Sequence, residues 1–350
     1  MSADEPAPTV RVIVVNYNSG NLLGRCIDAL HKQTFSDFEA IIVDNNSTDG
    51  SVDAAMVDDP RFTIRRLDDN IGFAAANNLG AKDAATPWLA MLNPDAFAEP
   101  NWLAELMDAT RRYPDTAMFG STQISANDPR KLDGSGDAYF AFGLAWRGNY
   151  GHPLGDLPED GETFSPCAAA ALYKTAAFQD VGGYDERFFC YLEDVDLGFR
   201  LRHKREHCVQ VKSAVVYHVG SALTGEKSDF VRFHSARNGI WLFSKNMPGV
   251  LFWLLLPGHV LLQLAWLARA ALHGQIKPVW LGIRAGLGGL SEIWQERPSV
   301  RAPENIKWTS ISRALCWSPW RLLNRGHDVR KYRLVRAPSE TPPPTLPKSL

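Results

Sequence analysis

The stretch WLAMLNPDA occupies residues 88–96, and the rest of the chain can be organised around it. Residues 88–92 form a short apolar run, which is typical of a strand buried on both faces of a sheet. Pro94 has no N–H to donate to a neighbouring strand, so the strand ends there. Asp95 is therefore expected at the carboxyl end of a central strand, where open α/β sheets bind ligands. The residues alone leave two interpretations open, an oxygen site for a divalent metal and an Asn-Pro-Asp turn without a ligand.

Similar apolar runs precede this stretch and predict a parallel sheet. They occupy residues 9–16, 39–44 and 62–67, and segments with helical spacing or small residues separate them. Polar side chains such as Asn16 and Asp44 end these runs, so we expect them together at one edge of the sheet. The alternation predicts an α/β fold, a mostly parallel sheet flanked by helices. No GxGxxG follows the first run and no P-loop occurs, which argues against a dinucleotide-binding protein.

The part of the chain after residue 97 is less regular. We predict a helix at 101–112 and a strand at 116–124. Residues 125–161 are rich in Gly, Asp and aromatic residues without a clear period, and we expect loops and short strands there. Residues 165–174 fit either a strand or the start of a helix. A further strand is predicted at 209–218, and it ends in a histidine.

The composition fits a globular protein with an uneven charge. The chain has 350 residues, 45% hydrophobic and 22% charged, which suits one large or two ordinary domains. Residues 1–200 hold 15 basic and 31 acidic side chains, whereas residues 201–350 hold 22 and 8, so the C-terminal part is expected to face an anionic partner. The five cysteines form no CxxC pair, which fits a reducing cytosol. Residues 1–8 lack the features of a signal peptide and are expected to be a disordered leader.

The C-terminal hundred residues have the composition of a membrane interface. Residues 250–268 carry no charged side chain and border on the length of a membrane span, but Pro257 and Gly258 interrupt the run and His259 and Gln263 dilute it. Seven of the 11 tryptophans follow residue 250, together with 14 basic and 5 acidic side chains in residues 251–350. An ordinary helical cap is the alternative. We predict a helical, interfacial extension at 247–336 and a Pro-rich disordered tail at 337–350.

Four motifs give the chain a family resemblance. They are VIVVNYN (12–18), IIVDNNSTDGS (41–51), NIGFAAANN…LNPDA (70–96) and VGGYDERFFCYLEDVDLGFRLR (181–202). Each is weak alone, but their order and spacing resemble the inverting family 2 glycosyltransferases with a GT-A fold, in particular the rhamnosyltransferase-like branch. VVYHVGSA (215–222) and ARN (236–238) follow at the positions usual in that family. The resemblance covers about residues 9–246, and implies a donor half at 9–125 and an acceptor half at 126–246.

The resemblance implies a nucleotide-sugar site and a metal site. Asp44 would accept a hydrogen bond from the N3–H of uracil or thymine, since a carboxylate only accepts. The nucleotide-sugar residues would be Asn16, Asp44, Asn70, Gly72, Phe73, Asn93 and Arg237. Asp95 and His218 would bind Mn²⁺ or Mg²⁺, although Asn93 stands where the family has the first acid of its DxD motif. His218 could instead be a strand-end histidine bonded to a carbonyl, and Arg237 could equally pair with surface acids.

The resemblance also implies an inverting, metal-dependent hexosyltransferase. Asp194, in preference to Glu193, would act as general base on the acceptor hydroxyl, and as the cap of a helix it would also be held in place. The donor would be dTDP-rhamnose or a UDP-sugar. The acceptor would be a glycan or a polyprenyl-diphosphate-linked sugar in cell-envelope polysaccharide biosynthesis. The enzyme would be cytoplasmic, peripheral at an anionic membrane surface, with no nucleic acid partner.

Two other functions compete with this interpretation. One is a sugar-nucleotide-binding scaffold without turnover, which loss of the Glu193/Asp194 pair would have favoured; both acids are present. The other is a sugar nucleotidyltransferase, which usually carries a basic, Gly-rich loop after the first strand. Here that segment is NYNSGNLLGR, with one basic residue.

Overall fold

The centre of the fold is a mixed sheet with parallel strands in its middle. The computed structural model describes residues 8–55, 58–220, 228–297 and 308–332. The strands of this sheet are β1 (Val10–Asn16), β2 (Phe38–Asp44), β3 (Phe62–Arg66), β4 (Trp88–Leu92), β5 (Ala96–Ala98), β6 (Met118–Ser125), β7 (Leu132–Ser135), β10 (Gly161–Glu162), β11 (Ala170–Lys174) and β12 (Cys208–His218). Their order is β10-β12-β6-β11-β4-β1-β2-β3, while β5 pairs with β12 and β7 with β6. A separate hairpin consists of β8 (Asp137–Phe140) and β9 (Leu144–Arg147).

The strand order reverses beside β1. The chain runs through β1, β2 and β3 in one direction and then returns to place β4 on the other side of β1, all four strands being parallel. β11 is antiparallel to both β4 and β6, and β6 is parallel to β12. Such a reversal opens a crevice at the carboxyl ends of the two strands that flank it. The residues that follow β1 and β4 therefore belong to the expected ligand-binding edge.

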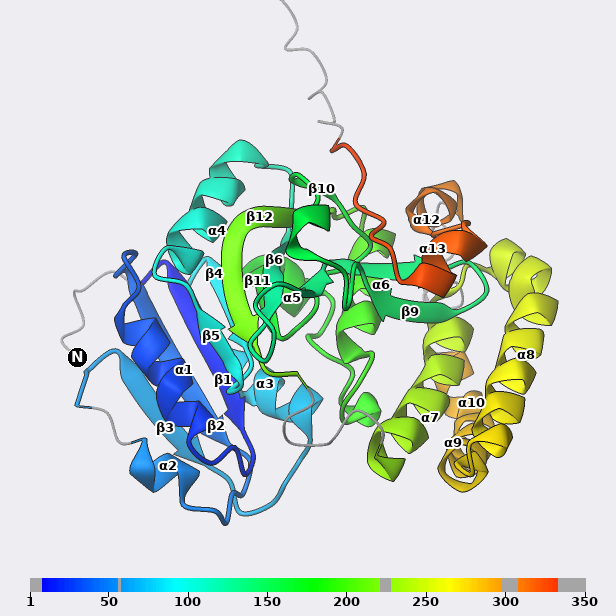
Figure 1. The fold of residues 1–350 in the computed structure, drawn as a ribbon, viewed down its shortest axis with the longest axis horizontal. Helices are drawn as coiled ribbons and strands as arrows, with labels where there is room; N and C mark the ends of the chain where they lie inside the picture. The colour runs from blue at the N-terminus through cyan, green and yellow to red at the C-terminus, as the bar shows by residue number, and fades with distance from the viewer. Residues whose placement is uncertain (1–7, 56–57, 221–227, 298–307, 333–350) are drawn as a thin grey trace, which may run out of the picture.

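Helices cover both faces of the sheet (Figure 1). One face carries α1 (Leu22–His31), α2 (Ser51–Ala54) and α4 (Trp102–Arg112), and the other carries α3 (Phe73–Ala81), α5 (Thr175–Asp180) and α6 (Glu193–His203). Successive side chains of a strand point to opposite faces. Val10, Val12 and Val14 of β1 therefore pack with the first group of helices, and Ile13 and Val15 pack with the second. Two short 3₁₀ helices, η1 (Leu154–Asp156) and η2 (Glu186–Phe188), lie in the connections.

The C-terminal helices lie at the opposite end of the molecule from β1–β3 (Figure 1). Those described are α7 (Asp229–Asn246), α8 (Gly249–Leu272), α9 (Ile276–Gly288), α10 (Leu290–Gln295), α12 (Trp308–Ala314) and α13 (Pro319–Asn324). α9 packs closely on α7 through two glycines. A Cβ at Gly282 would lie 2.4 Å from the carbonyl oxygen of Phe233, and one at Gly286 would lie 3.1 Å from that of Arg237. A larger side chain at Gly282 would push the helices apart.

These helices share a core with the preceding half of the chain. One buried cluster joins Tyr139 and Phe199 to Leu251 of α8 and Ile311 of α12. Beyond α13 the chain returns to the sheet, where the Thr116 hydroxyl donates to the Tyr332 hydroxyl at 2.9 Å. Contacts therefore cross the predicted boundary at residue 246, and a chain that ended there would lose part of this core.

The predicted fold class is confirmed, an α/β fold with a mostly parallel sheet flanked by helices and a helical C-terminal region. Of the two interpretations of residues 165–174, the strand is correct, as β11. The expected interruption at Pro257 is wrong, because α8 continues through it. Pro257 is exposed, and the neighbouring Leu255 and His259 are buried, so packing on the inner side keeps the helix continuous. The predicted leader, apart from residue 8, and the 337–350 tail lie outside the described residues.

Candidate active site

The first predicted site residues meet at the carboxyl ends of β1 and β2. Asn16 and Asp44 are register partners, and the Asn16 amide donates to Asp44 Oδ1 at 3.0 Å. The same amide nitrogen lies 3.0 Å from the hydroxyl oxygens of Ser47 and Ser51. Both Asn16 and Asp44 are buried. The strands and the following loop therefore fix these two polar side chains at the edge of the sheet.

The loop after β3 closes onto the same edge. The Asn45 amide donates to Asn70 Oδ1 at 2.8 Å, which ties the end of β2 to this loop. Gly72 has a φ of +87°, and a Cβ there would lie 2.5 Å from the Phe189 ring, so only glycine fits. Phe73 follows as the first residue of α3. Asn45 was not predicted as a site residue; its only signal in the sequence is its place directly after a strand.

The predicted metal pair meets across β4 and β12. Asn93 and Asp95 follow β4, and the pairing of β5 with the end of β12 places His218 opposite Ala96. His218 Nε2 lies 3.3 Å from Asp95 Oδ1, and both side chains are buried. The alternative of a histidine bonded to a backbone carbonyl has no support in the contacts of the imidazole, which face carboxylates and a guanidinium.

Asp133 of β7 contacts His218 from the other side. Its Oδ2 lies 2.7 Å from His218 Nδ1, and Arg147 of β9 pairs with the same carboxylate. Burial alone lowers the pKa of His218, but its hydrogen bonds with Asp133 and Asp95 outweigh that effect and raise the pKa to about 9. A carboxylate on Nδ1 fixes the ring so that Nε2 faces Asp95. Sequence reasoning missed Asp133 and Arg147 because the segment that contains them shows no periodic pattern.

One buried polar atom at this site, Asn93 Oδ1, has no hydrogen-bond partner among the described residues, and His218 Nε2 faces the Asp95 carboxylate alone. Buried polar atoms are normally paired, and an imidazole nitrogen beside a carboxylate suits Mn²⁺ or Mg²⁺, so the residues fit a divalent ion. The described part of the chain holds no group of three or more His, Cys, Asp or Glu arranged to bind a metal. The described residues therefore offer only part of a coordination shell.

Asp194 lies next to the turn that follows β4. Its Oδ2 accepts from the Ala168 N–H at 3.0 Å, and the next residue, Ala169, accepts from the Asn93 N–H at 2.9 Å. Two residues before β11 thus connect Asp194 to Asn93. Asp194 is partly exposed. The N-cap position of α6 belongs to Leu192, so the expectation that Asp194 itself caps the helix is wrong, although it lies in the first turn.

Glu193 and Asp196 lie on the same helix but in opposite electrostatic surroundings. Glu193 is buried and its Oε2 has no partner among the described residues, so burial, and next the Asp194 charge, raise its pKa well above the usual value. Asp196 is fully buried too, but Arg200 Nε and Lys245 Nζ lie 2.7 and 2.9 Å from its carboxylate. Burial opposes its ionisation, and Lys245 and Arg200 outweigh burial and lower its pKa.

Asp137, at the start of β8, is a further acid that sequence reasoning missed. It is buried, and burial followed by the nearby Asp194 charge raises its pKa well above the usual value. Its partner is the Ser165 hydroxyl, which lies 3.5 Å from Oδ2. Asp137 therefore adds a second buried carboxyl group to the surroundings of Asp194.

Arg237 contacts the loop before the acids. Its Nη2 donates to the carbonyls of Arg187 and Phe188 at 3.0 and 2.8 Å, and its guanidinium stacks over the Trp241 ring at 4.5 Å. These contacts hold the side chain against the loop. A role of Arg237 toward a diphosphate stays a prediction.

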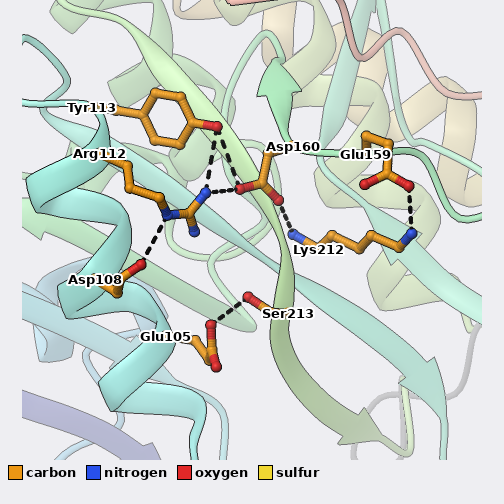
Figure 2. Close-up of a pocket in the computed structure, with 8 residues that line it drawn as sticks. All are labelled: Glu105, Asp108, Arg112, Tyr113, Glu159, Asp160, Lys212 and Ser213. Carbon is orange, nitrogen blue, oxygen red and sulfur yellow. Dashed lines mark hydrogen bonds and ion pairs between the residues drawn. The ribbon is translucent and has the colours of Figure 1, made fainter.

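A separate surface depression lies away from these residues. Figure 2 shows its lining side chains, in which Arg112 pairs with Asp108 and Asp160, and Lys212 pairs with Glu159. None of the predicted site residues lines it. Both cations of the depression, Arg112 and Lys212, thus already pair with carboxylates.

The chain is similar to known glycosyltransferases in sequence. The family model described as glycosyl transferase family 2 matches residues 11–182. The chain is 30% identical over 264 residues to the N-acetylglucosaminyl-diphospho-decaprenol L-rhamnosyltransferase of Mycobacterium tuberculosis, covering 66% of this chain and 85% of that protein. It is 32% identical over 203 residues to the O-antigen biosynthesis protein RfbC of Myxococcus xanthus, covering 55% of this chain and 16% of that protein.

Solved structures share the fold. A mannosyltransferase from Pyrobaculum calidifontis in complex with GDP-Man and Mn²⁺ superposes with a TM-score of 0.52 at 17% identity, covering 88% of this chain and 87% of that one. GalNAc-T7 with UDP, GalNAc and Mn²⁺ gives a TM-score of 0.55 at 17% identity, covering 69% and 48% of the two chains. At such low identity these likenesses show the fold alone.

The two buried acids of α6 should respond oppositely to substitution. Glu193→Gln should make the protein more stable than wild type as the pH rises above about 4.3, the usual value of a glutamate, because wild type must then keep a proton or bury a charge. Asp196→Asn should lower stability at pH 7 by about 1–3 kcal/mol, because Arg200 and Lys245 lose a buried carboxylate, although Lys245 keeps its ion pair with Asp185. This loss should shrink as the pH falls below about 4, where the wild-type acid also becomes neutral. Urea unfolding between pH 4 and 8 measures both, and parallel curves for the two variants would contradict the assignment.

Proposed function

The chain belongs to glycosyl transferase family 2, and we propose that it moves rhamnose from a nucleotide-diphosphate sugar to a lipid-linked acceptor. The observation that carries this proposal is the Asp95–His218 contact after β4, where the Ala168 and Ala169 backbone also connects Asp194 to Asn93. The rhamnosyltransferase relative supports dTDP-rhamnose as donor over a UDP-sugar, and its printed name supports a polyprenyl-diphosphate-linked acceptor. The product would enter cell-envelope polysaccharide.

The donor half, residues 9–125, would bind the nucleotide. Asp44 would accept a hydrogen bond from the N3–H of the base, as its burial beside Asn16 and its fixed orientation support. The Asn45–Asn70 hydrogen bond and the tight backbone at Gly72 would form the wall over the nucleotide. The acceptor half, residues 126–246, would supply the general base, Asp194.

Asp95 and His218 would hold a divalent ion, Mn²⁺ or Mg²⁺, with the diphosphate completing the coordination shell. The buried Nε2 of His218, which lies 3.3 Å from Asp95 Oδ1, supports this assignment, and Asp133 would keep that nitrogen directed at the site. When bound, the ion supplies neutralisation of negative charge on the leaving diphosphate. Asn93 in place of an acid leaves the site with one carboxylate fewer than the family's DxD pattern.

Asp194 would be the general base. Unlike Glu193 it is partly exposed, and its carboxylate is held by the Ala168 and Val195 N–H groups. Burial raises its pKa, and the backbone hydrogen bonds oppose this, so the carboxylate stays a better proton acceptor than an ordinary surface acid. Glu193, with its pKa raised well above the usual value, would stay protonated and is the poorer candidate.

The reaction would be a single displacement. The acceptor hydroxyl oxygen bonds to the anomeric carbon while its proton passes to Asp194, and the bond from that carbon to the diphosphate oxygen breaks. The nucleoside diphosphate leaves with the electron pair. Because no covalent enzyme intermediate forms, the anomeric configuration inverts. A nucleotidyltransferase would instead release pyrophosphate, and a binding scaffold would release nothing, so the product identifies the reaction.

The outer face of α8, formed by Trp253, Leu254, Leu261 and Leu264, would contact a membrane. These side chains are 57–69% exposed, although all are large and apolar. α8 is long and apolar enough to span a bilayer, and it is the one such helix found in the described part of the chain. A membrane-bound acceptor would explain why an enzyme keeps such a surface.

The packing of α8 favours a helix that lies in the membrane interface over one that spans the membrane. Buried side chains occur along α8 from Leu251 through His259 to Ala270, so both ends rest on the protein. The inner side of α8 packs on α9 and α12 and so does not face lipid. Exposed Lys277 and Arg284 on α9 would meet anionic head groups. We therefore place the enzyme at the cytoplasmic face of the membrane, with residues 247–336 as its contact region.

The donor site should depend on Asp95. Asp95→Ala should abolish the Mn²⁺-dependent binding of dTDP or UDP, because it removes the negative ligand, and His218→Ala should weaken it less. Calorimetry with and without Mn²⁺ measures both, and thermal shifts with dTDP-rhamnose and UDP-sugars identify the donor. Asp115→Ala, at an exposed acid, is the control. Unaltered Mn²⁺-dependent binding in Asp95→Ala would refute the metal assignment.

Turnover should depend on Asp194 more than on Glu193. Asp194→Asn should lower turnover about 100-fold or more while donor affinity stays close to wild type, because the base acts only on the acceptor proton. Glu193→Gln should lower turnover less than Asp194→Asn does. The assay follows nucleoside diphosphate release with a polyprenyl-diphosphate N-acetylglucosamine acceptor, and Asp180→Asn, at an exposed acid, is the control. Wild-type turnover in Asp194→Asn would remove it from the mechanism.

Membrane contact should depend on the outer face of α8. The full chain should co-sediment with anionic vesicles, less so at high salt, because basic side chains contribute about 1 kcal/mol each near the surface. Leu261→Glu combined with Leu264→Glu should leave the protein in the supernatant with donor binding intact. The control is Leu154→Glu, at a leucine on η1 that is 37% exposed, and this variant should still co-sediment with the vesicles. Sedimentation of the double variant like wild type would rule this face out, and resistance to alkaline wash would indicate an integral helix.

A further inference from the structure

The loop between η2 and α6 has an unusual backbone. Phe189, Tyr191 and Leu192 have φ angles of 64°, 72° and 68°. This left-handed region is rarely adopted by bulky residues, because the Cβ crowds the following carbonyl oxygen. Such strain persists only where neighbouring groups hold the backbone in place, and it gathers at functional sites. The contacts that hold this loop therefore bear on function.

Asn238 of α7 provides these contacts. Its Nδ2 donates to the carbonyls of Phe188, Cys190 and Tyr191 at 3.0, 3.0 and 2.7 Å. The side chain is fully buried. Arg237 Nε lies 2.8 Å from Asn238 Oδ1, so the amide oxygen faces the guanidinium and the nitrogen must face the carbonyls. One side chain thus binds most of the strained loop, in an orientation that its neighbour fixes.

The loop contacts both halves of the active site. Its Phe189 ring lies against Gly72 of the nucleotide loop, and the Phe189 carbonyl accepts from the Ala74 N–H at 3.1 Å. At its other end, Leu192 is the N-cap of α6, two residues before Asp194. A displacement of the loop would therefore change the position of Asp194 relative to the donor site.

We propose that Asn238, oriented by Arg237, is a positioning residue that holds the 188–192 loop and thereby aligns Asp194 with the bound donor. The inference rests on the proposed role of Asp194 as general base. Asn238 itself touches no reacting atom. Arg237 contributes by fixing the amide and by binding the Arg187 and Phe188 carbonyls, which gives this residue a task separate from any contact with a diphosphate.

The isosteric variant Asn238→Asp tests the proposal, because it replaces the donor with an acceptor that faces the carbonyls. Turnover should fall by about 10- to 100-fold, the usual scale for a misplaced catalytic group. The donor KM should change much less, because the Asn45–Asn70 hydrogen bond still holds the nucleotide loop. Hydrogen exchange of the amides in residues 186–196 should become faster. The matched control is Asn149→Asp, at a buried asparagine that donates to the Asp156 carbonyl at 2.8 Å, away from this loop.

A rescue experiment separates positioning from general destabilisation. Tyr191→Gly should restore part of the turnover lost in Asn238→Ala, because glycine adopts the left-handed conformation without support. The proposal would be overturned if the turnover losses of Asn238→Ala and Tyr191→Gly were simply additive in free energy when the two substitutions are combined. It would also be overturned if hydrogen exchange of residues 186–196 were unchanged in Asn238→Asp. If Asp194→Asn keeps wild-type turnover while Asn238→Asp still speeds exchange and slows turnover, the general-base assignment fails and the positioning role of the loop stands.

Discussion

The placement of β4 beside β1 is the constraint on which the site depends. Because the strand order reverses there, the residues that end β1 and β4, among them Asn16 and Asp95, come to the same edge of the sheet. β11 then runs antiparallel along β4, so Ala168 and Ala169, which precede it, connect the β4 turn to Asp194. The pairing of β5 with β12 adds His218. Backbone pairing alone thus gathers side chains that are far apart in the chain.

Burial gives neighbouring acids different properties according to their partners. Asp196 has Lys245 and Arg200 and stays ionised, Glu193 has neither, and Asp194 lies between these cases with backbone N–H donors and partial exposure. A carboxylate that must accept a proton needs this intermediate environment, since full burial would leave it protonated and a close cation would make it a weak base. The three acids lie on one turn of α6, and their different neighbours suit Asp196 to a structural role and Asp194 to the proposed role of general base.

The sequence was sufficient for the features that local patterns determine. The apolar runs predicted β1, β2 and β4 and the polar residues at their ends, and motif order predicted the family. Asp133, Asp137 and Arg147 were missed, because they come from short strands whose pattern has no period and whose partners are distant in the chain. The strained loop at Phe189–Leu192 was invisible as well, because its backbone is set by Asn238, a residue whose helix shows no sign of this contact in the sequence.

The C-terminal helices show why composition alone could not define a boundary there. The same helix, α8, carries Leu255 and His259 in the shared core and Leu254 and Leu261 on its exposed side. The apolar content that suggested a separate extension is thus divided between two tasks, and only the exposed side is free to contact lipid. α9 packs on α7 through glycines, and α7 carries Asn238, which holds the loop before the acids. The packed helices α7 and α9 therefore join the surface that we assign to the membrane to the loop that we propose aligns Asp194. This connection would set the height of the active site above a bilayer that carries the acceptor.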